Sequence, residues 1–141
     1  MNVIGAGYQW AFSFRKIIDN DGSYICNDDC ESLGKWHSCL NEQDFFLDVG
    51  CYFLPKDIAL QLTPIWYRKG RDPGVIEVDR MLCQVLRQNN LSCDSNYKYS
   101  LNYRTGNTQY SVKKEFFLHH NELMKNEYGG VLPWHKNNSF N

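Results

Sequence analysis

The residues from Asp72 to Asn90 form the most strongly patterned segment of the chain. Asp72 suits an N-cap, and Pro73 suits the first helical position because its missing N–H would have no partner there. Apolar side chains recur every three or four residues, at Val75, Val78, Leu82, Val85 and Leu86. The pattern predicts an amphipathic helix that covers another layer of the protein and ends near Asn89 and Asn90.

Alternating apolar residues predict strands on both sides of this helix. Before it, we expect strands over Tyr8–Ile18, Ser23–Ile25, Gln43–Phe53 and Ile58–Tyr67, with a hairpin turn at Asp19–Gly22. After it, two more strands, Tyr97–Tyr103 and Tyr110–Leu118, are expected to form a hairpin through a turn at 105–108. We expect a short helix at Asn121–Glu127 that ends at Gly129-Gly130, and a polar tail over Pro133–Asn141.

The predicted order is thus four strands, a helix, two strands and a short helix. Local hairpins favour antiparallel pairing, and an amphipathic helix can cover one face of such a sheet. The fold class is therefore α+β, with a mainly antiparallel sheet of about six strands and one long helix packed on one face. At 141 residues, we expect the chain (1–141) to form a single domain.

The charge is small overall but unevenly distributed along the chain. The net charge is -1, yet residues 1–63 hold nine acidic against four basic side chains, and residues 64–141 hold eleven basic against seven acidic. A nucleic-acid binder would show a basic surplus with clustered Lys and Arg. The balance therefore argues against direct binding of nucleic acid.

The chain shows no signal peptide and no apolar run that approaches a membrane span, so a cytoplasmic location is expected. Its six cysteines are then expected to be reduced thiols. Cys26, Cys30, His37 and Cys39 lie close in sequence, as zinc ligands do, but their spacing lacks two clean ligand pairs. We favour buried thiols and a surface histidine, and predict no metal and no cofactor.

His119-His120 is the clearest candidate for catalysis, because histidine is the commonest general acid or base. With the nearby Lys113, Lys114, Glu115 and Tyr110, the pair could supply the acid, base and phosphate-binding groups of a small metal-independent ribonuclease. Adjacent side chains point in different directions on a strand and on a helix, so the pair is better interpreted as structural. No dinucleotide loop, P-loop, zinc-protease motif or serine elbow is present.

Acidic and aromatic residues crowd the N-terminal third of the chain. This mixture suits binding to a basic protein, although a solvated surface is an equal alternative. The predicted protein-binding residues are Asp19, Asp21, Tyr24, Asp28, Asp29, Glu31, Trp36, Asp44, Phe46 and Asp48. Asp48 and Phe46 are expected to point outwards, opposite Phe45, Leu47 and Val49.

One acidic-sided α+β domain without export signal or catalytic motif resembles the immunity proteins that are paired with bacterial competition toxins. The resemblance implies a non-enzymatic immunity protein or antitoxin whose partner is a toxin, a basic nuclease, with its active site covered. Two alternatives stay open: a ribonuclease that uses His119 or His120, and a ligand-binding sheet with an aromatic pocket. That pocket would be formed by Trp10, Phe12, Tyr97, Tyr99 and Tyr103.

Overall fold

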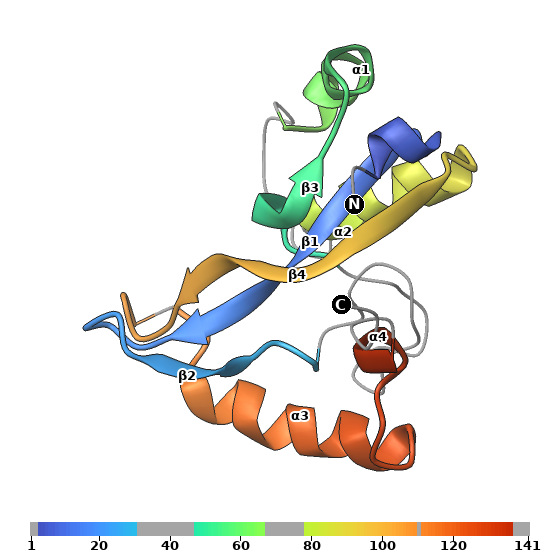
Figure 1. Cartoon of the computed structure of the whole chain (residues 1–141). Coiled ribbons are helices and arrows are strands. Elements are labelled where there is room, and N and C mark those ends of the chain that lie inside the picture. The colour runs from blue at the N-terminus through green and yellow to red at the C-terminus, as the bar shows by residue number, and fades with distance from the viewer. Residues whose placement is uncertain (1–2, 31–46, 67–77, 110, 137–141) are drawn as a thin grey trace.

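Strand β1 (Trp10–Ile18) is the centre of the sheet. The computed structural model describes residues 3–30, 47–66, 78–109 and 111–136. Strands β2 (Tyr24–Asn27) and β3 (Tyr52–Phe53) pair antiparallel with β1, and β4 (Cys93–Arg104) pairs parallel with it (Figure 1). The described residues thus form a four-stranded sheet in an α+β fold, and the prediction of about six strands is wrong.

Both faces of β1 are covered. Every residue from Trp10 to Arg15 is buried, although the alternating sequence predicted a half-buried strand. On one face, the ring centroid of Phe12 lies 5.7 Å from that of Trp10 and 6.1 Å from that of Phe14. On the other face, small or polar side chains such as Ser13 and Arg15 are also buried, which requires partners for the arginine inside the protein.

The predicted strand Tyr97–Tyr103 is confirmed within β4, but its predicted partner is wrong. β4 pairs with β1 in parallel, from Trp10 opposite Cys93 to Ile18 opposite Arg104. Parallel strands need a long crossover connection, and helices α1 and α2 lie between β3 and β4 in the chain. Between Phe12 and Phe14 the register shifts, and Tyr97 in this irregularity adopts a positive φ of 56°.

The predicted strand Ile58–Tyr67 is wrong, because Lys56–Trp66 forms helix α1. Ile58, Leu60 and Leu62 alternate, but Ile58, Leu62 and Ile65 also have helical spacing, and these three are the more buried residues. Leu60, on the other side of the helix, is 62% exposed. Pro64 lies in the last turn, where it does not prevent the helix.

The predicted strand Tyr110–Leu118 is also wrong, and with it the second predicted hairpin. Helix α3 spans Lys114–Glu127, so it begins seven residues before the short helix that was expected at Asn121. Its buried residues are Phe117, Asn121 and Met124, an i, i+4, i+7 stripe. The polar Asn121 in the middle of this stripe disguises the helical period in the sequence.

Two other predicted elements are shorter than expected in the described residues. The helix expected over Asp72–Asn90 is present as α2 (Val78–Gln88), and its predicted beginning lies outside the described ranges. Of the strand expected over Gln43–Phe53, only β3 is a strand. The short 3-10 helix η2 (Val49–Cys51) precedes it, and residues 43–46 are not described.

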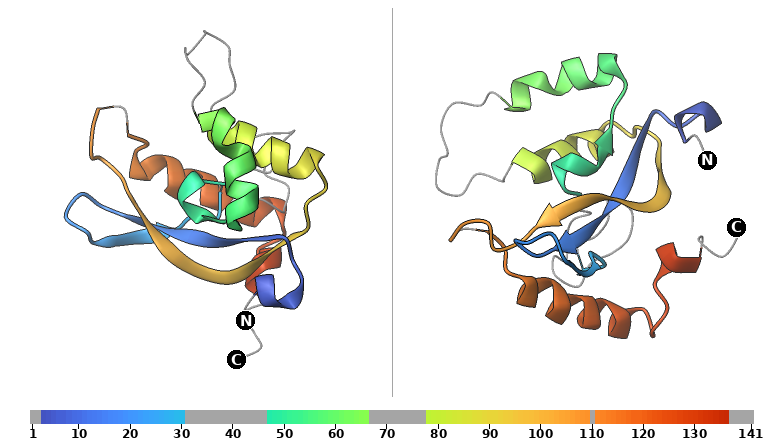
Figure 2. Two further views of the ribbon diagram at one scale, coloured as in Figure 1. Left: turned by 90° about the horizontal axis from the view of Figure 1, so that it is seen from above. Right: turned by 60° about the vertical axis from the view of Figure 1, so that its left-hand side comes forward.

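The helices share the covering of the sheet, so the prediction of one long helix on one face is not confirmed. Figures 1 and 2 show α1 and α2 next to each other near the start of β1, and α3 beside β2. After Gly129 and Gly130, which have positive φ as expected of a helix end, the chain forms the short helix α4 (Pro133–Lys136). Trp134 in α4 is fully buried, so the expected polar tail is wrong over these residues.

We expect Leu86→Ala to lower the free energy of unfolding by about 2–5 kcal/mol, because Leu86 of α2 is fully buried in the core. Urea denaturation followed by circular dichroism measures the change. Gln84→Ala on the exposed side of the same helix is the control, with an expected change within about 0.5 kcal/mol. Equal effects of the two substitutions would show that α2 is not packed as described.

Candidate functional site

The turn between β1 and β2 presents acidic and aromatic side chains to solvent on a braced backbone. The N–H of Asp19 donates to the Ser23 carbonyl at 2.8 Å, and that of Gly22 donates to the Asp19 carbonyl at 3.0 Å. Gly22 has a φ of 91°, a conformation that favours glycine. The predicted hairpin turn at Asp19–Gly22 is therefore confirmed, and its geometry is closely constrained.

Asp21 lies at the tip of this turn. Its Oδ1 accepts hydrogen bonds from the Ser23 hydroxyl at 2.6 Å and the Ser23 N–H at 2.9 Å. These donors hold the pKa of Asp21 below its usual value, so the carboxylate is ionised at neutral pH. Tyr24 follows, 60% exposed, and its hydroxyl donates to Asn27 Oδ1 at 3.2 Å. The turn thus holds an ionised acid, and the strand that follows it begins with a large exposed aromatic ring.

A second loop reaches the same end of the molecule. The buried Thr105 donates from both its N–H and its hydroxyl to the carbonyl of Ile18, at 3.0 and 3.2 Å. This contact joins the residues after β4 to the β1–β2 turn (Figure 1). We call the two loops, residues 19–24 and 105–109, the hairpin end.

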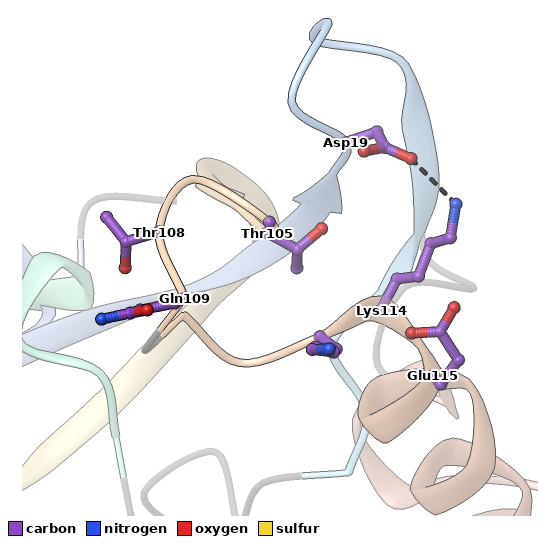
Figure 3. A pocket seen from close by; sticks show the side chains of 8 residues that line it. Asp19, Thr105, Thr108, Gln109, Lys114 and Glu115 are labelled. Carbon is purple, nitrogen blue, oxygen red and sulfur yellow. Dashed lines mark hydrogen bonds and ion pairs between the residues drawn. The ribbon is translucent and has the colours of Figure 1, made fainter.

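A pocket of about 450 Å³ opens beside the hairpin end. Figure 3 shows Thr108 and Gln109 on one side of it and Asp19 and Lys114 on the other. Lys114 Nζ lies 3.0 Å from Asp19 Oδ2, which connects the hairpin to the start of α3. The N–H of Asn20 and this ammonium group lower the pKa of Asp19.

Asp28 does not face solvent. It is 1% exposed and accepts from Arg15, with Nε 2.6 Å from Asp28 Oδ2. The same guanidinium places Nη1 2.5 Å from Asp48 Oδ2 and lies over the ring of Tyr103, 4.3 Å from its centroid. The other oxygen of Asp28 accepts from the Cys30 N–H at 3.2 Å. Arg15 is thus held between two carboxylates within the protein.

Asp29 is buried as well, with 6% exposure, in a separate network. Its Oδ1 accepts from the Tyr99 hydroxyl and from Trp134 Nε1 at 2.8 Å, and His135 Nε2 lies 3.4 Å away. Burial alone would raise the pKa of Asp29, but donors on His135, Tyr99 and Trp134 outweigh it and hold the pKa below its usual value. The Asp29 N–H donates to Asn121 Oδ1 at 3.0 Å.

The structure therefore separates the ten predicted protein-binding residues. Asp19, Asp21 and Tyr24 share the hairpin end, while Asp28 and Asp29 are buried and cannot form part of an exposed acidic surface. Asp48, expected to point outwards, is half-buried against Arg15. The other four, Glu31, Trp36, Asp44 and Phe46, lie outside the described residues. One feature of the sequence does indicate buried carboxylates: Arg15 lies within an apolar strand, where its charge requires an acidic partner.

The geometry adds no support for a metal site, for catalysis by His119 or His120, or for an aromatic ligand pocket. Within the described ranges, no group of three His, Cys, Asp or Glu side chains is placed to hold a metal, and His37 and Cys39 lie outside them. His120 Nδ1 lies 2.8 Å from the Phe116 carbonyl one turn earlier in α3. Trp10 and Phe12, expected in an aromatic ligand pocket, are fully buried against each other in the core.

Comparisons with protein-family models, curated proteins and solved structures found no match. Among the described residues, no helix has the length and apolar character needed to cross a membrane.

We expect Arg15→Met to destabilise the protein by about 3–5 kcal/mol, because it leaves Asp28 buried without its cation. Chemical denaturation measures the loss. Lys16→Met, at the exposed neighbouring position of β1, is the control. Addition of Asp28→Asn to Arg15→Met is expected to restore part of the stability. If the double variant is no more stable than Arg15→Met, the pair is not coupled as described.

The lowered pKa of Asp29 predicts that part of the free energy of unfolding is lost at acidic pH. Its pKa is lowered from 3.8 in the folded protein, so its contribution to stability is complete above that value and is lost as the pH falls through the folded value. We expect the free energy of unfolding to fall less steeply between about pH 4 and 2 in Asp29→Asn than in the wild type. Gln61→Ala, at an exposed position of α1, removes no titrating group and is expected to keep the wild-type slope. If the free energy of unfolding falls with the same slope in all three proteins, Asp29 does not contribute to acid sensitivity as described.

Proposed function

We propose that this chain acts by binding another protein through the hairpin end. In its most concrete form, it is an immunity protein or antitoxin that neutralises a basic nuclease toxin by covering the toxin's active site. The observation that carries the proposal is the hydrogen-bonded turn that holds the ionised Asp21 and is followed at once by the exposed Tyr24.

A braced turn favours binding, because little conformational freedom is lost when the partner docks. Asp21 is fixed by Ser23, and the whole turn is tied through Ile18 to Thr105. Exposed tyrosines are common among the residues that contribute most to interface affinity. Carboxylates around such an anchor attract a basic partner and raise the association rate.

In this proposal, the predicted binding residues have two different roles. Asp19, Asp21 and Tyr24 contact the partner. Asp28, Asp29 and Asp48 instead support the hairpin from inside, since their carboxylates are occupied by Arg15, Trp134 and other donors. The proposed role is non-catalytic and needs no metal or cofactor.

The first experiment is native mass spectrometry of the untagged protein, isolated gently from the cell that makes it. A stoichiometric basic partner is the expected result. Isolation of the chain alone, at a concentration where a nanomolar complex would persist, would contradict the proposal.

Once the partner is identified, Tyr24→Ala is expected to weaken binding by about 2 kcal/mol, which is roughly 30-fold in Kd. Isothermal titration calorimetry measures the change. Phe53→Ala is the matched control, because Phe53 is 53% exposed on β3, away from the hairpin end. Asp21→Asn is expected to lower the association rate and its dependence on salt. If Phe53→Ala weakens binding as much as Tyr24→Ala, the hairpin end is not the contact surface.

A further inference from the structure

Helix α4 is attached to the rest of the protein by a small number of well-defined contacts. Leu132 and Trp134 are almost fully buried, and the Trp134 ring meets that of Tyr128 edge-on at a centroid distance of 5.7 Å. Trp134 Nε1 donates to Asp29 Oδ1 at 2.8 Å, across 105 positions of sequence. The contact thus fastens the C-terminal part of the described chain to the end of β2.

His135 connects this attachment to solvent. Its side chain is 41% exposed, so its ring can exchange protons with water. Its Nε2 nevertheless lies 3.4 Å from Asp29 Oδ1 and 3.0 Å from the Tyr99 hydroxyl. One nitrogen of an accessible imidazole therefore faces a buried negative charge.

The groups around His135 come from several elements. Asp29, after β2, attracts a proton to the ring and raises its pKa above the ordinary 6.5, while Lys125 of α3 opposes it. Burial and the nearby charge of Asp29 raise the pKa of Tyr99 in β4, so its phenol stays protonated at neutral pH.

Two side chains of β2 also lie in the field of Asp29. Burial first, and then neighbouring charges, raise the pKa of Tyr24 and raise that of Cys26 to about 11. Both are therefore neutral near pH 7. The charge of Asp28 also adds to the raised pKa of Tyr99, and Asp28 itself is paired with Arg15. Among these neighbours, His135 alone changes its charge near neutral pH.

We infer that α4 is a pH-dependent latch, held tightly on Asp29 while His135 is cationic and held less tightly once His135 is neutral. The raised pKa of His135 sets the direction of the pH dependence. The extra stability is fully present below the ordinary value of 6.5 and is lost as the pH rises through the folded value. Opening of the latch would expose Trp134 and the carboxylate of Asp29 together.

Amide hydrogen exchange of residues 128–136, corrected for the intrinsic pH dependence of exchange, tests the latch. Protection in the wild type is expected to fall between about pH 5.5 and 8.5. The fold-change should equal the ratio of the acid dissociation constants of His135 in the open and closed forms. NMR titration of the ring supplies the closed-form constant, and the ordinary pKa of 6.5 serves for the open form. A flat profile, or a fold-change that disagrees with this ratio, would overturn the inference.

Two variants identify the group responsible. His135→Gln keeps a neutral donor at the same position, so its protection is expected to be independent of pH. Lys125→Gln removes the opposing charge and is expected to move the midpoint to higher pH, whereas Lys56→Gln on α1 leaves it unchanged. Persistence of the wild-type profile in His135→Gln would show that another group controls α4. Equal midpoints for the two lysine variants would also count against the latch.

Discussion

Two adjacent buried carboxylates, Asp28 and Asp29, control how the parts of this protein meet. A buried charge is costly unless it is paired and hydrogen-bonded, so each must find donors inside the fold. Asp28 takes its cation, Arg15, from the central strand. Asp29 takes donors from β4 and α4, and its backbone takes an acceptor, Asn121, from α3. Elements distant in sequence are thereby fixed around the end of one short strand.

The same short strand also connects the interior to the surface. It begins at Tyr24, the most exposed aromatic side chain of the hairpin, and the chain reaches the buried Asp28 and Asp29 directly after it. The exposed turn is therefore not an independent loop, because its two strands are anchored in the core. Arg15 in β1 and Asp28 beyond β2 join the two sides of the hairpin by an ion pair.

Local patterns were sufficient to locate one turn, one strand and one helix, although they did not identify what each packs against. The turn at Asp19–Gly22, the core of β1 and the apolar stripe of α2 could be recognised from spacing and turn chemistry. The sequence of helix α1 predicts a strand as readily as a helix, because its apolar residues satisfy both a period of two and a helical period. The apolar stripe of helix α3 is interrupted in the sequence because the polar Asn121 occupies a buried position, where its amide oxygen accepts a hydrogen bond from the Asp29 N–H.

The burial of the two carboxylates could not be inferred in the same way. Carboxylates next to a turn are usually solvated, and nothing nearby in sequence distinguishes these two. Their partners are separated from them by 13 residues for Arg15, 70 for Tyr99 and 105 for Trp134. Only Arg15, a charged residue within an apolar strand, indicates that an acidic side chain is buried. It does not identify which acid is its partner. Pairwise contacts at such separations depend on topology, which residue spacing does not report.

The parallel pairing of β1 with β4 has a consequence for how the chain folds as it is synthesised. Phe14 lies opposite Tyr99, and Gln9 exchanges hydrogen bonds with Ser92. The central strand therefore cannot complete its pairing until residues more than 80 positions later have been synthesised. Synthesis proceeds at roughly 5–20 residues per second, which leaves one edge of β1 open for several seconds. During that interval the β1–β2 hairpin can form, but the apolar residues of β1 stay partly uncovered. The nascent chain is therefore most exposed to aggregation before β4 leaves the ribosome.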